Sequence, residues 1–487
     1  MNVTPSDLNH PRLRFLVAIA SYGGKNDAFL RRIIQTYQSM PMDVDVVVLS
    51  EAPKNLGPTV KVIVGLPSSN PWSLPFGHKQ LFAENLERYD LFAYSEDDME
   101  VTEQNVEAFL KATPALAADE IAGFLRYEID PSGGWSLPEV HGASHWKPES
   151  LVQRNGYMVG EFTNEHAAFY LLTQAQLRKA IASGGFLRDP CEGRYDMLCT
   201  AATDPYTNCG FHKVICVSAL EDFLIHHLPN RYVGQLGLPL SSFKEQIKTL
   251  VDIGARTHPA STLCQLESKL MHGRCSKSYY EKPDQELLNL IPADAKSVLS
   301  IGCGAGDLEA VLKKRGCQVT SLPLDSVIGA AAARRGIEVV YGSWEEGMQR
   351  LAGRKFDCVL IPNLLHLQSD SGRFLEACVR CVGPGGTLLL SGPNFGRLPN
   401  RLKRTFGANG HRQLQNFDES GVNVSGPRIW AAHIKKNGLG SISIHWFDHE
   451  LSPGRLGRLK LSLGSLTARN WILGARRSSL SSNPRSV

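Results

Sequence analysis

Residues 297–306, Ser-Val-Leu-Ser-Ile-Gly-Cys-Gly-Ala-Gly, decide the fold of the second half of the chain. The apolar run at 297–301 predicts a buried strand, and residues 308–314 have the pattern of the helix that follows it. The three glycines therefore fall in a strand-to-helix turn, where backbone can approach a ligand closely. The third glycine comes one place too early for a dinucleotide motif, Gly-x-Gly-x-x-Gly, because Asp307 holds the last position.

Later stretches extend this pattern in a fixed order. Residues 356–366 read as a strand ending near Asn363 and His366, and residues 382–394 contain Pro-Gly-Gly before another apolar strand. Together with the glycine turn they resemble the class I methyltransferases, and residues 441–446 and 470–475 look like the antiparallel last two strands of that family. The resemblance implies a Rossmann-like α/β domain that uses S-adenosylmethionine.

The resemblance also assigns residues to the cofactor site. It implies contacts from the turn and from later strand ends: Gly302, Cys303, Gly304, Gly306, Asp325, Ser343 and Asn363. Two places depart from the family, which usually has acidic residues that bind the ribose and the adenine amine. Pro323 occupies the first place, with Asp325 two residues on as a substitute, and Ser343 occupies the second. His366 is the catalytic candidate, and a helix-capping histidine is the alternative.

The first half of the chain carries a group of acidic residues. The apolar runs 15–20 and 44–49 flank a helical pattern and predict a βαβ opening, and the strand 91–94 runs into Glu96-Asp97-Asp98. Adjacent like charges are costly unless a cation compensates them, and Mg²⁺ or Mn²⁺ prefers carboxylate oxygens. A metal site for a nucleotide diphosphate is one interpretation, and an acid-rich helix N-terminus is the other.

Residues 12–232 resemble glycosyltransferases of the GT-A fold, with Glu96-Asp97-Asp98 as the metal motif. The resemblance implies that Asp196 is the base acting on the acceptor hydroxyl and that a later histidine, His226 or His227, completes the metal site. Of the two we expect His226. Glu221 and Asp222 are rival candidates for the base. The substrate implied is a nucleotide-sugar donor.

The length of 487 residues favours two or three domains. We expect a GT-A-like domain at 12–235, a helical linker at 236–282, a methyltransferase domain at 283–477 and a disordered tail at 478–487. The net charge of +4 gives no reason to expect nucleic acid as a partner. The scattered eleven cysteines suggest reduced thiols, and a polar start without long apolar runs suggests a soluble cytoplasmic protein. Basic clusters near the end are compatible with peripheral binding to an anionic membrane.

The two resemblances predict a bifunctional transferase. One domain would add a sugar, and the other would methylate a glycan, a lipid-linked acceptor or a glycosylated small molecule. The alternatives are that one domain alone is active and the other binds the acceptor or serves as a scaffold. Pro323 and Ser343 favour a scaffold role for the second half.

Overall fold

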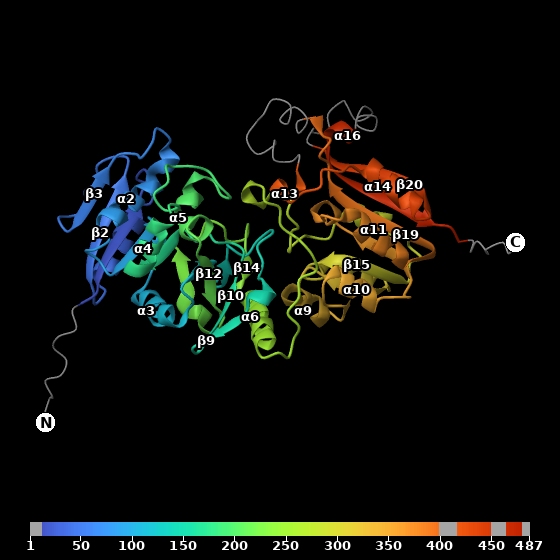
Figure 1. Ribbon diagram of the computed structural model, residues 1–487, viewed down its shortest axis with the longest axis horizontal. Coiled ribbons are helices and arrows are strands. Elements are labelled where there is room, and N and C mark those ends of the chain that lie inside the picture. Colours follow the sequence, from blue (N-terminus) through green and yellow to red (C-terminus); the bar gives the residue numbers. More distant parts are fainter. Residues whose placement is uncertain (1–11, 399–415, 450–463, 480–487) are drawn as a thin grey trace, which may run out of the picture. The chain divides into compact units, whose positions relative to one another are not determined.

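The computed structural model describes residues 12–398, 416–449 and 464–479 (Figure 1). The chain divides into two compact units: the first comprises residues 1–141 and 145–247, and the second 142–144 and 248–487. The boundary falls inside the segment 236–282, which the sequence predicted to be a linker. Most of the predicted tail, residues 480–487, lies outside the described residues.

A five-stranded sheet forms the centre of the first unit. Its order is β11-β4-β1-β2-β3, and β11 is antiparallel to β4 whereas the other pairs are parallel. The strands are β1 (Arg14–Ala20), β2 (Asp43–Ser50), β3 (Val60–Val64), β4 (Leu91–Glu96) and β11 (Phe169–Thr173). The unit's helices are α1 (Asp27–Gln38), α2 (Gly77–Glu84), α3 (Glu103–Ala112), α4 (Gln174–Ala182), α5 (Met197–Thr207) and α6 (Leu240–Gly254), which runs into the second unit.

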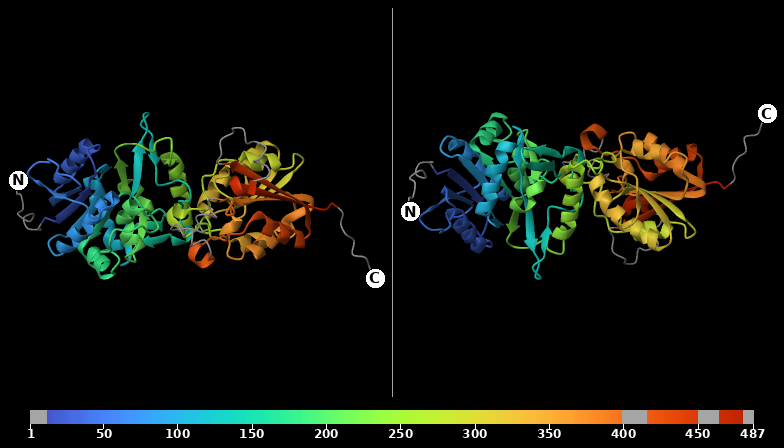
Figure 2. Two further views of the ribbon diagram at one scale, coloured as in Figure 1. Left: turned by 90° about the horizontal axis from the view of Figure 1, so that it is seen from above. Right: turned by 90° about the horizontal axis from the view of Figure 1, so that it is seen from below.

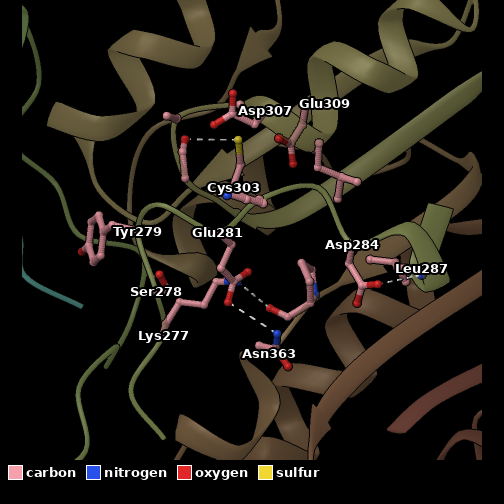
Figure 3. Close-up of a pocket in the computed structure, with 17 residues that line it drawn as sticks. Lys277, Ser278, Tyr279, Glu281, Asp284, Leu287, Cys303, Asp307, Glu309 and Asn363 are labelled. Atoms are coloured by element: carbon pink, nitrogen blue, oxygen red, sulfur yellow. Dashed lines mark hydrogen bonds and ion pairs between the residues drawn. The ribbon is translucent and has the colours of Figure 1, made fainter. Parts of the chain in front are cut away.

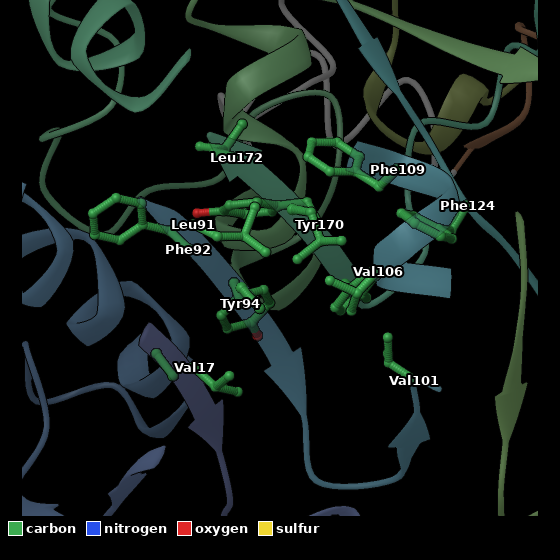
Figure 4. Close-up of a cluster of buried hydrophobic side chains, with 14 of the residues drawn as sticks. Val17, Leu91, Phe92, Tyr94, Val101, Val106, Phe109, Phe124, Tyr170 and Leu172 are labelled. Carbon is green, nitrogen blue, oxygen red and sulfur yellow. The ribbon is translucent and has the colours of Figure 1, made fainter. Parts of the chain in front are cut away.

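Two smaller sheets complete the first unit. One consists of β6 (Glu120–Ala122), β12 (His212–Cys216), β10 (Tyr157–Glu161) and β9 (Val152–Arg154). The other consists of β14 (Leu238–Pro239), β8 (Trp135–Leu137), β7 (Leu125–Ile129), β13 (Leu224–His227) and β5 (Met99–Glu100). Aromatic side chains from β4 and β11 pack with Phe109 and Phe124 in a buried core (Figure 4).

The second unit is built on a seven-stranded sheet. Its order is β17-β16-β15-β18-β19-β21-β20, and only β21 runs against its neighbours. The strands are β15 (Ser297–Cys303), β16 (Gln318–Pro323), β17 (Glu338–Val339), β18 (Phe356–Ile361), β19 (Val382–Pro393), β20 (Leu439–His449) and β21 (Ala468–Arg477). The helices are α7 (Gln285–Leu290), α8 (Asp307–Lys314), α9 (Ser326–Arg334), α10 (Trp344–Arg350), α11 (Ser371–Cys381), α13 (Phe417–Ser420), α14 (Pro427–Lys436) and α16 (Gly464–Thr467).

Alternate residues of these strands enter two separate hydrophobic clusters. In β18, for example, Val359 and Ile361 belong to one cluster, and Cys358 and Leu360 to the other. Because successive side chains of a strand point to opposite faces, both faces of the sheet are covered, and Figure 2 shows helices on each side. The carboxyl ends of the parallel strands therefore form the edge of the sheet at which ligands bind in such folds.

Two further expectations concern the whole chain. All eleven cysteines are free thiols, as the sequence predicted. In the described parts of the chain, we find no helix whose length and apolar content would suit a membrane span.

Candidate functional site

The glycine turn after β15 has a separate physical reason for each glycine. Gly302 and Gly306 both have φ of +86°, a left-handed conformation that favours glycine. Gly304 has no such constraint, but a Cβ atom there would lie 2.4 Å from the carbonyl oxygen of Tyr279. The middle glycine thus permits close packing of another part of the same chain against the turn.

That other part is a strap, residues 258–282, which crosses the carboxyl edge of the seven-stranded sheet. Its backbone bonds to the ends of successive strands: Leu263 N–H donates to the Leu324 carbonyl at 2.9 Å, and the Leu263 carbonyl accepts from Trp344 N–H at 2.8 Å. Further along, Lys277 reaches the carbonyl of Pro362, which follows β18. The strap therefore covers the edge where a ligand of this sheet would bind.

A cavity of about 50 Å³ lies between the strap and the turn (Figure 3). It is lined by all the turn residues predicted to bind the cofactor, Gly302, Cys303, Gly304 and Gly306, and by Asn363. Asn363 has φ of +50°, and its side-chain amide donates to Glu281 at 3.4 Å. Burial raises the pKa of the Cys303 thiol well above its usual value, and the Glu309 carboxylate adds to the rise. Cys303 is therefore an inert lining thiol.

The strap also contributes residues that the sequence did not reveal. The Lys277 side chain is only 2% exposed, and its ammonium donates to Glu281 at 2.5 Å and to the Pro362 carbonyl at 3.0 Å. Tyr279 is buried beside the turn, and the strap backbone around it lines the cavity. The only sequence signal was the four-residue spacing of Lys277 and Glu281.

Asp325 and Ser343, two predicted cofactor contacts, do not line this cavity. Asp325 is 2% exposed, and its carboxylate caps α9 by accepting from Ile328 N–H at 2.8 Å. Ser343 caps α10 in a reciprocal arrangement with Glu346. Both side chains therefore have structural roles at helix N-termini. The nearby place expected to hold an acid is Pro323, the last residue of β16.

His366, the predicted catalytic residue, also lies outside the cavity. Its Nε2 is 2.8 Å from the carbonyl of Cys275 in the strap, and because a carbonyl only accepts, Nε2 carries the proton. Burial lowers the pKa of His366 to about 4, so the ring is neutral at physiological pH. Nδ1 is buried and has no hydrogen-bond partner among the described residues. The His366 imidazole is therefore neutral, and the lone pair of its Nδ1 is available.

In the first unit, the acidic group lies at the carboxyl end of β4. The Asp97 carboxylate accepts from Ser21 at 2.6 Å and from Asn26 at 2.7 Å, and Asn26 also donates to Asp98 at 3.2 Å. Burial raises the pKa of Glu96 to about 8, with Asp98 as the next cause. The β1–α1 turn, which carries Ser21 and Asn26, thus supplies donors that sequence patterns did not identify.

The two candidate metal histidines lie beside different carboxylates. His227, not His226, lies beside Asp98, with 3.5 Å between its Nε2 and Oδ2, and its Nδ1 is 2.5 Å from Glu128. His226 instead stacks on Tyr127 and lies 3.8 Å from Glu100. Successive residues of a strand point to opposite faces, which separates the two histidines. Among the residues that the structure describes, no three His, Cys, Asp or Glu side chains form a group that could hold a metal ion.

Asp196 lies close enough to Glu96 to raise the pKa of that carboxyl, as Asp97 and Asp98 also do. It caps α5, accepting from Cys199 N–H at 2.9 Å. The rival residues lie elsewhere: Asp222 accepts from Gln104, and Glu221 pairs with Lys244 on α6. The structure therefore brings Asp196, and neither rival, toward the acidic group.

The family match lies in the second unit. Residues 282–413 match the family model described as methionine biosynthesis protein MetW. The ubiquinone biosynthesis O-methyltransferase of Stutzerimonas stutzeri is 33% identical over 101 residues, 20% of this chain and 44% of that protein. The protein of the same description from Methylobacterium nodulans is 34% identical over 121 residues, 24% of this chain and 46% of its own length. The chain thus spans under half the length of these curated relatives.

Solved structures with detectable similarity include two S-adenosylmethionine-dependent methyltransferases. The one from Archaeoglobus fulgidus is 13% identical, with a TM-score of 0.30 and coverage of 38% of this chain and 87% of that chain. The one from Mesorhizobium loti is 18% identical, with a TM-score of 0.30 and coverage of 39% and 96%. The strand order and the single reversed strand of the second unit, together with its sequence relatives, are those of the class I methyltransferase fold.

Proposed function

We propose that the second unit transfers a methyl group from S-adenosylmethionine to an acceptor. The observation that carries this proposal is the cavity at the glycine turn, at the carboxyl edge of a sheet of the methyltransferase fold. When bound, the cofactor supplies a methyl group on a positively charged sulfur, ready for attack by a nucleophile. The residues fit such a ligand: backbone N–H groups at Gly302–Gly306, the Lys277 ammonium and the Asn363 amide surround one space.

A second cavity suits the acceptor. It measures about 360 Å³ and lies beyond the end of β19, the strand next to β18, among Asn394, Phe395, Val424, Ile429 and Trp446. The lining is mostly apolar and aromatic, which favours an acceptor with an aromatic or aliphatic portion. The His366 ring lies 6.0 Å from that of Phe395, which lines this cavity, and its Nδ1 is the base proposed to accept a proton from an acceptor hydroxyl.

Calorimetric titration of the full chain with S-adenosylhomocysteine tests the cofactor, and mass detection of added methyl groups on a panel of phenols, glycolipids and glycosylated small molecules tests the acceptor. We expect saturable binding and methylation of at least one apolar acceptor. Absence of binding at millimolar ligand contradicts the proposal.

We further propose that the first unit transfers sugar from a nucleotide-sugar donor, with Asp196 as the base. The convergence of Glu96, Asp97, Asp98 and Asp196 at the end of β4 supports it. The described residues do not fit a resident metal ion, so no step is assigned to Mg²⁺ or Mn²⁺. The alternative is a first unit that only binds the acceptor for methylation.

Donor turnover by Asp196→Asn and Asp222→Asn, each with and without added Mn²⁺, separates these possibilities. Sugar transfer predicts loss of turnover in the first variant and little change in the second. No turnover of any nucleotide sugar by the wild-type chain supports the binding-module alternative.

A further inference from the structure

Lys277 is a buried cation whose anionic partner comes from the same short segment. Its side chain is 2% exposed, while that of Glu281, four residues on, is 34% exposed. Buried ammonium groups are rare unless paired, because desolvating a lone charge is expensive. The neighbouring Pro362 carbonyl, 3.0 Å away, adds a neutral acceptor but no charge. Glu281 therefore supplies the compensating charge, and it does so from the rim of the cavity.

The other acidic residues that line the cavity have fixed roles. Asp284 caps α7, Asp307 pairs with Arg335, and Glu309 accepts from Ser300 at 2.6 Å. Figure 3 shows Glu281 reaching between Lys277 and Asn363 across the cavity. Glu281 is thus the lining carboxylate that meets the buried cation directly and can still leave toward solvent.

The cavity is too small for a nucleoside ligand with Glu281 in this position. Its volume is about 50 Å³, whereas small-molecule sites typically measure roughly 300 to 1,000 Å³. A lining side chain must move before such a ligand enters. Backbone carbonyls and capping carboxylates are held by the fold, so the side chain of Glu281 is the part that moves at least cost.

On the basis of the proposed cofactor, we infer that Lys277 binds the carboxylate of the amino-acid end of S-adenosylmethionine, and that Glu281 occupies this position until the ligand arrives. The ligand then exchanges one carboxylate for another on the same ammonium, so that Lys277 stays paired in both states. Glu281 competes with the ligand from within the chain, and it weakens binding by the free energy needed to release it.

Calorimetry of the full chain with two probes tests this exchange. S-adenosylhomocysteine carries the amino-acid end, and 5′-methylthioadenosine has the same nucleoside and sulfur without it. We expect Lys277→Gln to weaken binding of the first probe by about ten-fold or more, since charge-assisted hydrogen bonds contribute that much. Binding of the second probe stays within about two-fold, because its contacts do not include Lys277.

For Glu281→Gln we expect the opposite effect on the affinity for S-adenosylhomocysteine. Removing the internal carboxylate is expected to strengthen binding of S-adenosylhomocysteine several-fold, while the exposed Lys296, which does not line the cavity, changed to Gln, leaves both probes unaffected. Glu281 is partly exposed, so we expect Glu281→Gln to fold normally. This variant therefore tests the exchange even if Lys277→Gln lowers the thermal stability.

Three results would overturn the inference. Weaker binding of S-adenosylhomocysteine by Glu281→Gln means that Glu281 holds the ligand's amino group instead. Equal losses for both probes in Lys277→Gln mean that the lysine supports the strap only. Failure of the wild-type chain to bind either probe overturns the proposed function itself, which the first two outcomes leave intact.

Discussion

The carbonyl oxygen of Tyr279 lies 2.4 Å from the position that a Cβ atom on Gly304 would occupy. A methyl group at residue 304 therefore meets a backbone atom, which cannot rotate aside as a flexible side chain does. The space between the strap and the glycine turn at residue 304 is therefore too small for one additional carbon atom.

Gly304→Ala should consequently lift the strap from the turn. We expect a loss of about 1 to 3 kcal/mol in the free energy of unfolding, the usual effect of overpacking. Denaturant titration measures it. Gly440→Ala on β20 is the matched control, because a Cβ there meets nothing within 4 Å. Equal stabilities of the two variants would show that the strap does not pack on the turn in solution.

His366 should make the second unit sensitive to acid. Burial lowers its pKa from 6.5 to about 4, so the unfolded chain binds the extra proton between these values. Stability is complete above pH 6.5 and declines as the pH falls toward 4, by up to roughly 2 to 3 kcal/mol from this residue. Denaturant titrations at both ends of this window should show a smaller difference for His366→Gln. The exposed His445, changed to Gln, serves as control; an unchanged pH dependence in His366→Gln contradicts the prediction.

Lys79 and Asp204 form an ion pair in the first unit whose side chains are 3% and 0% exposed. Asp204→Asn leaves the lysine charge buried without its partner, and we expect a loss of about 3 to 5 kcal/mol. The Lys79→Met/Asp204→Leu double variant should recover much of it. Asp90→Asn breaks the exposed pair with Arg14 and should cost less than about 1 kcal/mol. A similar small loss for Asp204→Asn would argue against a buried pair.

Strands and the glycine turn were predictable because they depend on local patterns. The predicted apolar run at 15–20 forms β1, Arg14–Ala20, and the run at 297–301 forms the start of β15. Strand patterns and strand-ending glycines can be recognised from residues that are neighbours in the sequence. The two α/β halves could therefore be located from the sequence.

The strap was not predictable in the same way. Its contacts run through backbone groups, such as Leu263 to Leu324 and Trp344, which any residue type can supply. Sequence patterns likewise leave open which of two adjacent histidines faces an acidic group, since a shift of one residue reverses the face. His227 rather than His226 approaches Asp98 for that reason.

The extent of the strap also determines where the chain can be cut. A recombinant fragment beginning at residue 283, the expected domain start, would lack every group that bonds to the Leu324 and Pro362 carbonyls and to Trp344 N–H. Such a fragment would expose the floor of the proposed cofactor site and the apolar surface under Tyr279. An expression boundary just before His258, whose ring bonds to the Ser326 carbonyl at 3.0 Å, retains the covering segment in full.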